Sequence, residues 1–260
     1  MSLWTSGEVY EAYMGRWSRL VAAEHVRRLG VGPGRRWLDV GCGTGALTSA
    51  VLAAAEPASV LGVDPSEAFV EHAAAHVAEQ RAEFRVAEAG DLPLPDSSVE
   101  VVVSGLVLNF VADQPAAARE MHRVLGPGGR VGCYVWDYAG GMQMLRHFWD
   151  VAASLDPASR EADQGERFEI CQPEPLRRLM SDAGFDDVAV DEIVVPTVFT
   201  DFEDYWSPFL AGRAPAPSYV MTLSDGDRAT LRAALRDDLP TDADGAIRLT
   251  ARAWEVTGRR

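Results

Sequence analysis

Strand-like apolar runs and helical stretches alternate along the first half of the chain. The runs lie at residues 37–40, 59–63, 83–87, 99–104 and 130–136. Helical stretches follow several of them, at residues 47–55, from residue 65 onward and at residues 115–125. Residues 99–104 are apolar almost throughout, as in a central parallel strand that is buried on both faces. This repeated alternation predicts a doubly wound α/β sheet whose strands are mostly parallel.

The second half departs from this regular order. Helical spacing returns at residues 142–155, 175–183 and 227–239, and strand patterns return at residues 188–195 and 247–256. We expect the last two strands to form an antiparallel hairpin at the sheet edge, which completes a sheet of seven strands. A loop is predicted around Pro215 and Pro217. Residues 137–172 and 201–246 have too little apolar content for cores of their own, so they are interpreted as two insertions on a single domain, residues 1–260.

The N-terminal segment also shows helical spacing, over residues 8–29. It carries more aromatic and polar contact groups than a plain packing helix needs, among them Tyr13 and Trp17. Two interpretations stay open for this segment. It is either an amphipathic helix that covers an edge of the core or, with the rest of residues 1–35, a helical lid over a bound ligand.

Composition and charge disfavour several classes of partner. Apolar residues make up 47% of the chain, yet no apolar segment approaches the roughly 20 residues that span a bilayer. The first residues lack the basic and apolar regions of a secretory signal, so we expect a cytoplasmic protein with no membrane partner. A net charge of −15 disfavours nucleic acid, whose phosphates need a basic surface. Three widely spaced cysteines predict neither a disulfide framework nor a zinc site, and the oligomeric state is left open.

A glycine-rich loop after the first predicted strand is the most informative stretch. Gly41, Gly43 and Gly45 alternate there, where side chains would keep a ligand away from the backbone. A nicotinamide dinucleotide site needs Gly-x-Gly-x-x-Gly, so this spacing disfavours an oxidoreductase. Asp64 ends the second strand, where its carboxylate can accept hydrogen bonds from both hydroxyls of a ribose. The alternative is that Asp64 only forms a turn before Pro65.

Five segments of the chain form an ordered set of motifs. They are residues 38–45, 62–66, 90–96, 101–104 and 120–129. In this order they resemble the class I methyltransferases that use S-adenosylmethionine, in particular the small-molecule branch near the quinone-ring methyltransferases. The resemblance covers residues 36–136 and implies a Rossmann-like methyltransferase fold. It also implies that this region is the cofactor-binding core, that the cofactor is S-adenosylmethionine and that no metal is required.

The resemblance implies a role for each part of the glycine loop and its flanks. The backbone at Gly41, Gly43 and Gly45 would receive the methionine part of the cofactor. Asp39 would hold the ammonium group of the cofactor directly or through water, and Asp64 would bind the ribose. Asp91, at the adenine, would be a third carboxylate beside Asp39 and Asp64. Three negative charges around the cofactor fit the positive charge of its sulfonium group.

Further residues are assigned to the cofactor by the same resemblance. Asp91 would accept a hydrogen bond from the adenine amino group, while the Leu92 backbone N–H would reach a ring nitrogen. Pro65 would flank the adenine ring. Ser104 and Gly105 would border the methionine chain and the transferring methyl group. The remaining candidates for cofactor contact are Tyr13 and Trp17.

The sequence identifies no single catalytic base. Methyl transfer is an in-line displacement that depends mainly on alignment, and a base is needed only where the acceptor must lose a proton. The candidates, chosen for their places after strands or in the first insertion, are His147, Asn109, Asp137 and Tyr138. Aromatic residues of the two insertions are expected either to line an apolar substrate pocket or to anchor the insertions to the sheet.

These observations predict methyl transfer from S-adenosylmethionine to a small, ring-containing organic molecule. The alternative from another class is a protein that binds the cofactor without transferring the methyl group, as a sensor or a regulatory subunit.

Overall fold

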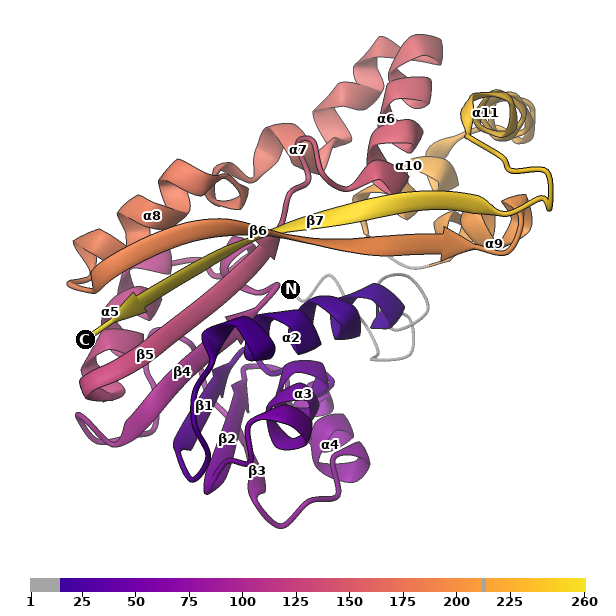
Figure 1. Ribbon diagram of the computed structural model, residues 1–260. Helices are drawn as coiled ribbons and strands as arrows, with labels where there is room; N and C mark the ends of the chain where they lie inside the picture. The colour runs from indigo at the N-terminus through magenta and orange to yellow at the C-terminus, as the bar shows by residue number, and fades with distance from the viewer. Residues whose placement is uncertain (1–14, 212–213) are drawn as a thin grey trace. The chain divides into compact units, whose positions relative to one another are not determined.

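The computed structural model describes residues 15–211 and 214–260, and these form two compact units (Figure 1). The core unit comprises Ser18–Val135, Ile170–Ile193 and Ala253–Arg260. The helical unit comprises Trp136–Glu169, Val194–Arg252 and the described residues of the segment before Ser18. The helical unit thus includes most of the first predicted insertion and all of the second.

Seven strands form one sheet, in the order β3-β2-β1-β4-β5-β7-β6. Their bounds are β1 Arg36–Val40, β2 Ser59–Asp64, β3 Ala82–Val86, β4 Val99–Gly105, β5 Leu125–Trp136, β6 Asp186–Phe199 and β7 Ile247–Arg259. β1 pairs with β2 and β4 in parallel, as do β2 with β3 and β4 with β5. The doubly wound, mostly parallel sheet is therefore confirmed.

The last strand lies where the hydrophobic alternation placed it, inside the sheet. β7 is the neighbour of both β5 and β6. In the core unit the Gly128 N–H donates to the Arg260 carbonyl oxygen, and in the helical unit the Asp137 N–H donates to the Arg252 carbonyl oxygen. Residue numbers rise along β5 while they fall along β7, so these two strands are antiparallel. The prediction of a seventh strand over residues 247–256 is confirmed.

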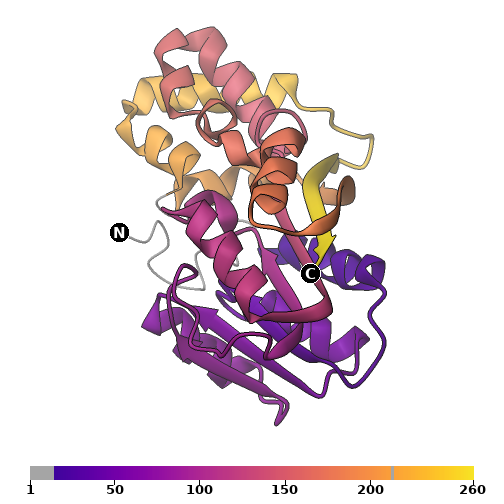
Figure 2. The same ribbon diagram turned by 90° about the vertical axis from the view of Figure 1, so that its left-hand side faces the viewer.

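Helices cover both faces of the sheet in the core unit. α2 (Arg16–Leu29), α3 (Ala46–Ala54) and α4 (Glu67–His76) lie on one side, and α5 (Gln114–Val124) and α8 (Pro173–Asp182) lie on the other (Figures 1 and 2). Ser66 caps α4 as predicted, because its hydroxyl oxygen accepts a hydrogen bond from the Phe69 N–H at 3.4 Å. Among the described residues, no helix combines the length and the apolar character needed to cross a bilayer.

The N-terminal helix covers the core over residues 18–29. Val21, Ala22, Val26 and Leu29 are all buried on one face of α2. The interpretation as an amphipathic helix at the core edge is therefore confirmed for these residues. The lid interpretation concerns mainly residues 1–14, which lie outside the described part of the chain.

The junction between α5 and β5 differs from the prediction. A helix ending at Leu125 and a strand beginning at Arg130 were expected, but β5 begins at Leu125, directly after α5. Val99 pairs with Leu125 and Val101 pairs with Arg130, so β5 carries extra residues between these two pairs. The glycines of residues 126–129 therefore form a bulge inside the strand, which bends it without ending the pairing.

The helical unit contains more helix than the sequence pattern predicted. Its helices are α6 (Gln143–Leu155), η3 (Pro157–Ala162), α7 (Gln164–Arg167), α9 (Phe202–Trp206), η5 (Ser207–Leu210), α10 (Pro215–Thr222) and α11 (Asp225–Asp238). The predicted loop around Pro215 and Pro217 was wrong, because both residues lie in the first turn of α10. Proline is tolerated there since the first-turn N–H groups have no partner within the helix.

Candidate functional site

The glycine loop connects β1 to α3 in a conformation that only glycine adopts easily. Gly41, Gly43 and Gly45 all have positive φ, at 74°, 51° and 87°. A Cβ atom on Gly41 would lie 2.4 Å from Val107 Cγ1, and one on Gly45 would lie 2.7 Å from Val77 Cγ2. A Cβ atom on Gly43 would meet nothing within 4 Å. Close packing therefore explains two glycines, while the backbone at the third, Gly43, has open space beside it.

Asp39 lies at the base of this loop with an incomplete set of hydrogen bonds. The side chain is 0% exposed, and its Oδ2 accepts a hydrogen bond from the Thr48 hydroxyl at 2.7 Å. Its Oδ1 is also buried but receives no hydrogen bond from any described residue. Burial raises the pKa of Asp39 to about 7, against the opposing effect of the Thr48 hydrogen bonds. A ligand that brings a positive charge and N–H donors would satisfy this carboxylate.

Asp64 is held by backbone groups at the end of β2. Its Oδ1 accepts the Ser66 N–H at 2.9 Å and its Oδ2 accepts the Gly43 N–H at 3.1 Å. Burial raises the pKa of this carboxyl, and the two N–H groups partly oppose that effect. Each carboxylate oxygen has a second lone pair. The bond from the Ser66 N–H is the contact of a turn-forming aspartate, while the free lone pairs leave the carboxylate able to accept further hydrogen bonds, so both interpretations of Asp64 stay open.

The end of β3 brings the carboxylate of Glu88 near Asp64. Asp64 pairs with Val86, the last residue of β3, and Glu88 follows two residues later. The negative charge of Glu88 is one of the causes that raise the Asp64 pKa, whereas Asp91 is not among them. Glu88 was not among the predicted residues, because the proline-rich motif after it directed the assignment to Asp91, which stays a prediction. The position of Glu88 just beyond a strand end, like that of Asp64, is the signal that would have found it.

The Leu92 backbone N–H, predicted to reach an adenine ring nitrogen, has a partner within the chain. That N–H donates to Glu120 Oε2 at 2.8 Å, so it is not free for an adenine ring nitrogen. Arg123 bonds the carbonyl oxygens of Leu92 and Leu94 at 3.1 and 2.8 Å, and also bonds Glu120. Arg123 thereby holds the pKa of Glu120 below its usual range. α5 thus fixes the loop after β3, and the motif residues Glu120 and Arg123 position that loop.

The residues at the end of β4 have mainly packing partners. The Ser104 hydroxyl donates to the Val40 carbonyl oxygen at 2.7 Å and so ties β4 to β1. A Cβ atom on Gly105 would lie 2.4 Å from the Tyr134 hydroxyl oxygen, so only glycine fits there. Leu106 follows with φ 62°, a strained conformation for a non-glycine residue. Pro65 is exposed directly after Asp64, where a ring of the cofactor could lie against it.

The two aromatic candidates of the N-terminal segment, Tyr13 and Trp17, remain predictions as cofactor contacts. Tyr13 lies outside the described residues. Trp17 belongs to the helical unit, where it is 3% exposed and its ring lies edge-on against Phe199 at 5.1 Å. The Arg16 guanidinium lies 4.5 Å from the centre of the same ring. These contacts explain the burial of Trp17 without a cofactor.

Two of the four candidate catalytic residues have ionic partners. Asp137 is 4% exposed and accepts two hydrogen bonds from the Arg252 guanidinium, at 2.8 and 2.7 Å. His147 Nδ1 lies 2.7 Å from an oxygen of Asp238, which links α6 to α11. The ion pair with Arg252 gives Asp137 a structural role, whereas a carboxylate at Nδ1 also suits a general-base histidine, so His147 stays a candidate.

The other two candidates, Tyr138 and Asn109, differ from this pair. The Tyr138 ring packs against Phe168 at 5.7 Å. Asn109 is 8% exposed in the short helix η2 (Leu108–Phe110), after β4. Its Nδ2 is buried and donates to none of the described residues. Among the four candidates, Asn109 thus has a buried polar group without a hydrogen-bond partner among the described residues.

Most of the aromatic residues expected at a substrate pocket form the core of the helical unit. Phe148 and Phe209 are stacked with ring centres 4.5 Å apart. The Trp149 Nε1 donates to Gln164 Oε1, and the Tyr205 hydroxyl donates to the Met144 carbonyl oxygen. All of these rings are buried, so the anchoring interpretation applies to them.

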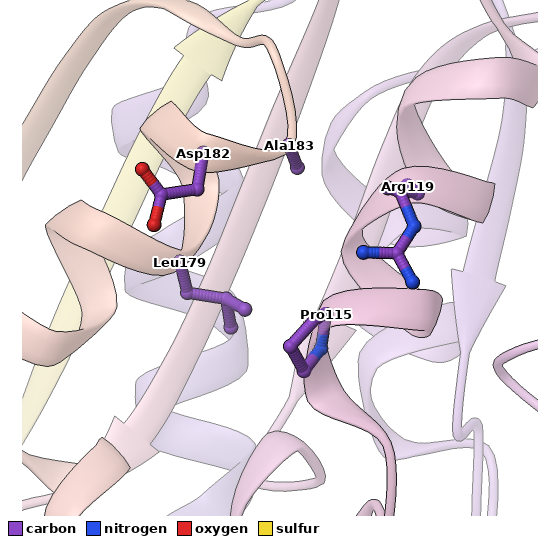
Figure 3. A pocket seen from close by; sticks show the side chains of 5 residues that line it. All are labelled: Pro115, Arg119, Leu179, Asp182 and Ala183. Atoms are coloured by element: carbon purple, nitrogen blue, oxygen red, sulfur yellow. The ribbon is translucent and has the colours of Figure 1, made fainter.

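A separate surface cavity lies between α5 and α8 of the core unit (Figure 3). Pro115 and Arg119 line it from α5, and Leu179, Asp182 and Ala183 line it from α8 and its C-terminal end. No residue of the glycine loop and none of the site carboxylates contributes to this cavity. It is therefore not part of the cofactor site.

Comparison with known proteins agrees with this geometry. A methyltransferase domain family matches residues 38–133. The demethylmenaquinone methyltransferase of Symbiobacterium thermophilum is 39% identical over 124 residues, which are 45% of this chain and 47% of the relative. The match thus spans about half the length of that relative. The demethylmenaquinone methyltransferase of Staphylococcus aureus (strain Newman) is 31% identical over 177 residues, 64% of this chain and 73% of the relative.

A solved structure extends the likeness to nearly the whole chain. Phosphoethanolamine N-methyltransferase 2 of Haemonchus contortus, in complex with phosphomonomethylethanolamine and S-adenosylhomocysteine, matches with a TM-score of 0.61 and 18% identity. The match covers 97% of this chain and 56% of that one. At this identity the likeness shows the fold alone. Taken together with the curated relatives, the chain belongs to the class I S-adenosylmethionine-dependent methyltransferases, with S-adenosylmethionine as its cofactor.

Proposed function

We propose that this chain transfers the methyl group of S-adenosylmethionine to a small organic molecule that contains a ring. The observation that carries the proposal is the buried Asp39 carboxylate, with one unsatisfied oxygen beside an open glycine loop. A buried carboxylate is costly unless a cation or N–H donors pair with it. The ammonium group of the cofactor meets both needs. When bound, the cofactor supplies an electrophilic methyl group on a sulfonium.

The core unit contributes three carboxylates to hold the cofactor in place. Asp39 binds the ammonium group, and Asp64 accepts the ribose hydroxyls with the lone pairs that Ser66 and Gly43 leave free. Glu88 adds an acceptor next to Asp64 at the end of β3. These groups act by fixing position, which is the main requirement of an in-line displacement.

The Asn109 side chain supports a methyl acceptor that is acidic enough to ionise by itself. Its Nδ2 is a buried donor without a partner among the described residues, and a neutral amide does not take up a proton near pH 7. The acceptor therefore ionises without help from this residue, as an acidic enol or a phenol conjugated to a carbonyl group does. The Asn109 N–H donates to the acceptor oxygen and orients it. The match to demethylmenaquinone methyltransferases supports a ring of this type.

Calorimetry with S-adenosylmethionine, followed by mass spectrometry of products, tests the proposal. The full chain is incubated with the cofactor and a panel of hydroxylated aromatic and quinol rings, with Asp39→Asn as the matched control. Cofactor binding together with a methylated ring supports methyl transfer. Binding without any methylated product favours the alternative, a cofactor-binding sensor or regulatory subunit. Failure of the folded chain to bind the cofactor contradicts both.

A further inference from the structure

We propose that Thr48 is a positioning residue for the buried Asp39 carboxylate, and that it thereby makes the site selective for ligands that carry a protonated amino group. Thr48 lies in the first turn of α3 and is 0% exposed. Its hydroxyl donates to Asp39 Oδ2 at 2.7 Å. This role rests on the proposed function, because Thr48 acts on the ligand only through the carboxylate assigned to the cofactor ammonium group.

The neighbours of Asp39 in the sheet offer it no polar side-chain atom. In β1 this residue pairs with Gly62 of β2 and with Val103 of β4. The hydrogen bonds that lower the pKa of Asp39 come from the hydroxyl and the backbone N–H of Thr48. Among the described residues, the carboxylate therefore depends on Thr48 for its orientation.

The bond from Thr48 decides which oxygen of Asp39 is left for a ligand. The last torsion of an aspartate side chain has broad minima, so the carboxylate turns easily unless a partner holds it. Because the Thr48 hydroxyl occupies Oδ2, the oxygen that stays without a partner is the buried Oδ1. A donated O–H also favours the ionised form of a carboxyl group. Thr48 therefore supports both the orientation and the negative charge that an ammonium group needs.

The adjacent hydroxyl, that of Ser49, shows the contrast with an ordinary helical position. It donates to the Gly45 carbonyl oxygen at 2.8 Å, four residues earlier in the chain, which is a common bond for a hydroxyl inside a helix. The Thr48 hydroxyl instead bonds a residue of β1, and the Thr48 N–H is one of the first four of α3, which have no partner within the helix. Ser49 is exposed, so Ser49→Ala is a control for the loss of a hydroxyl from this turn.

Calorimetry on the full chain with two ligands tests this role. S-adenosylmethionine carries the ammonium group, whereas 5′-methylthioadenosine keeps the adenine, the ribose and the sulfur but lacks the amino-acid part. Thr48→Val should bind S-adenosylmethionine about tenfold more weakly than the wild type and methylthioadenosine with unchanged affinity. Thr48→Ser, which keeps the hydroxyl, and Ser49→Ala should bind both ligands like the wild type. Equal affinity of folded Thr48→Val and wild type for S-adenosylmethionine, or an equal loss for both ligands, overturns the role.

The pH dependence of binding supplies a second measurement, which a merely structural threonine would not change. The ionisable groups near Asp39 are Asp64, whose negative charge raises the Asp39 pKa, and the Cys42 thiol, which burial keeps neutral by raising its own pKa. In the wild type, affinity for S-adenosylmethionine should fall as pH falls through about 7, where Asp39 takes up its proton. Loss of the Thr48 hydroxyl raises this pKa further, so in Thr48→Val the fall should begin at a higher pH. An unshifted profile contradicts the role.

A double variant shows whether Thr48 acts through Asp39. In the Asp39→Asn background the carboxylate charge is absent, so adding Thr48→Val should not weaken S-adenosylmethionine binding further. This comparison needs only the two variants that lack the buried charge, so it holds even if Thr48→Val alone does not fold. A further loss in the double variant shows that Thr48 acts independently of Asp39 and overturns the role. If the wild type itself binds no S-adenosylmethionine, the proposed function fails, and this role fails with it.

Discussion

The two units of the chain differ in how their buried carboxylates are paired. In the helical unit, Asp137 is bonded twice by Arg252, and Asp163 accepts hydrogen bonds from Arg146 and from the Gly165 N–H. In the core unit, Asp39 is fully buried, and among the described residues no cation lies beside it and its Oδ1 has no hydrogen-bond partner. An unpaired buried charge is expensive. The paired carboxylates therefore have a structural explanation, whereas the unpaired one fits the cationic ligand that we propose.

The largest effect is expected from Asp39→Asn. Between the ordinary pKa of 3.8 and about 7, folded Asp39 retains a proton that the unfolded chain has lost, so its contribution to stability falls as pH rises through this window. At pH 8 the variant should be more stable than the wild type by roughly 2–4 kcal/mol, and at pH 4 the difference should vanish. Urea denaturation at the two pH values measures this.

The same substitution should weaken cofactor binding. Loss of a charged hydrogen bond corresponds to about 10- to 100-fold in affinity, which calorimetry measures. A variant that gains stability and loses cofactor binding is expected where the replaced residue serves ligand binding at a cost in stability. A variant that is less stable than the wild type at pH 8 would show that Asp39 is a structural residue.

The next largest effect is expected from Arg252→Met in the helical unit. This change leaves Asp137 buried without its cation. We expect a loss of about 2–4 kcal/mol in the free energy of unfolding, below the value for a fully buried pair because Arg252 is one-third exposed. Denaturant unfolding measures the loss, and the double variant Asp137→Asn, Arg252→Met should recover part of it. If the single variant is as stable as the wild type, the paired carboxylate is not structural.

A smaller effect is expected from Glu88→Ala, and it should exceed the effect of Asp91→Ala on cofactor affinity. Glu88→Ala removes an acceptor next to Asp64 and should weaken cofactor binding about tenfold, the equivalent of one hydrogen bond. Asp91→Ala should change the affinity by less than about threefold, because Glu88 and not Asp91 is among the charges that act on Asp64. Calorimetry on the two variants decides between them. The reverse order would restore Asp91 to the site.

The smallest effect is expected from His147→Gln. The pair with Asp238 is partly exposed, with 29% of the histidine and 45% of the aspartate side chain accessible. Such pairs contribute less than about 1 kcal/mol, so thermal unfolding should change little. If instead the variant stays folded but loses methyl transfer, His147 is a base and the contrast between the units fails.

Local patterns in the sequence were sufficient for most elements of the core unit, though not for the junction of α5 and β5. The second strand, predicted over residues 59–63 and found at Ser59–Asp64, and the cap at Ser66 follow from an apolar run and from residues adjacent in the chain. The helical unit was harder to predict. Pro215 and Pro217 favoured a loop by composition, yet proline in a first turn is compatible with helix, and the packing of α10 decides between them.

The sequence alone determined the fold class, the glycine loop and the positions of Asp39 and Asp64 on the first two strands, because these depend on spacing within one strand–helix–strand unit. Tertiary structure alone decided which carboxylate lies near Asp64 and what the Leu92 N–H binds, since the pairing of β2 with β3 and the Glu120 side chain set those contacts. It also decided that Asp137 is paired, because its partner Arg252 is 115 residues away. Contacts between distant segments depend on how the strands assemble, and no local spacing encodes them.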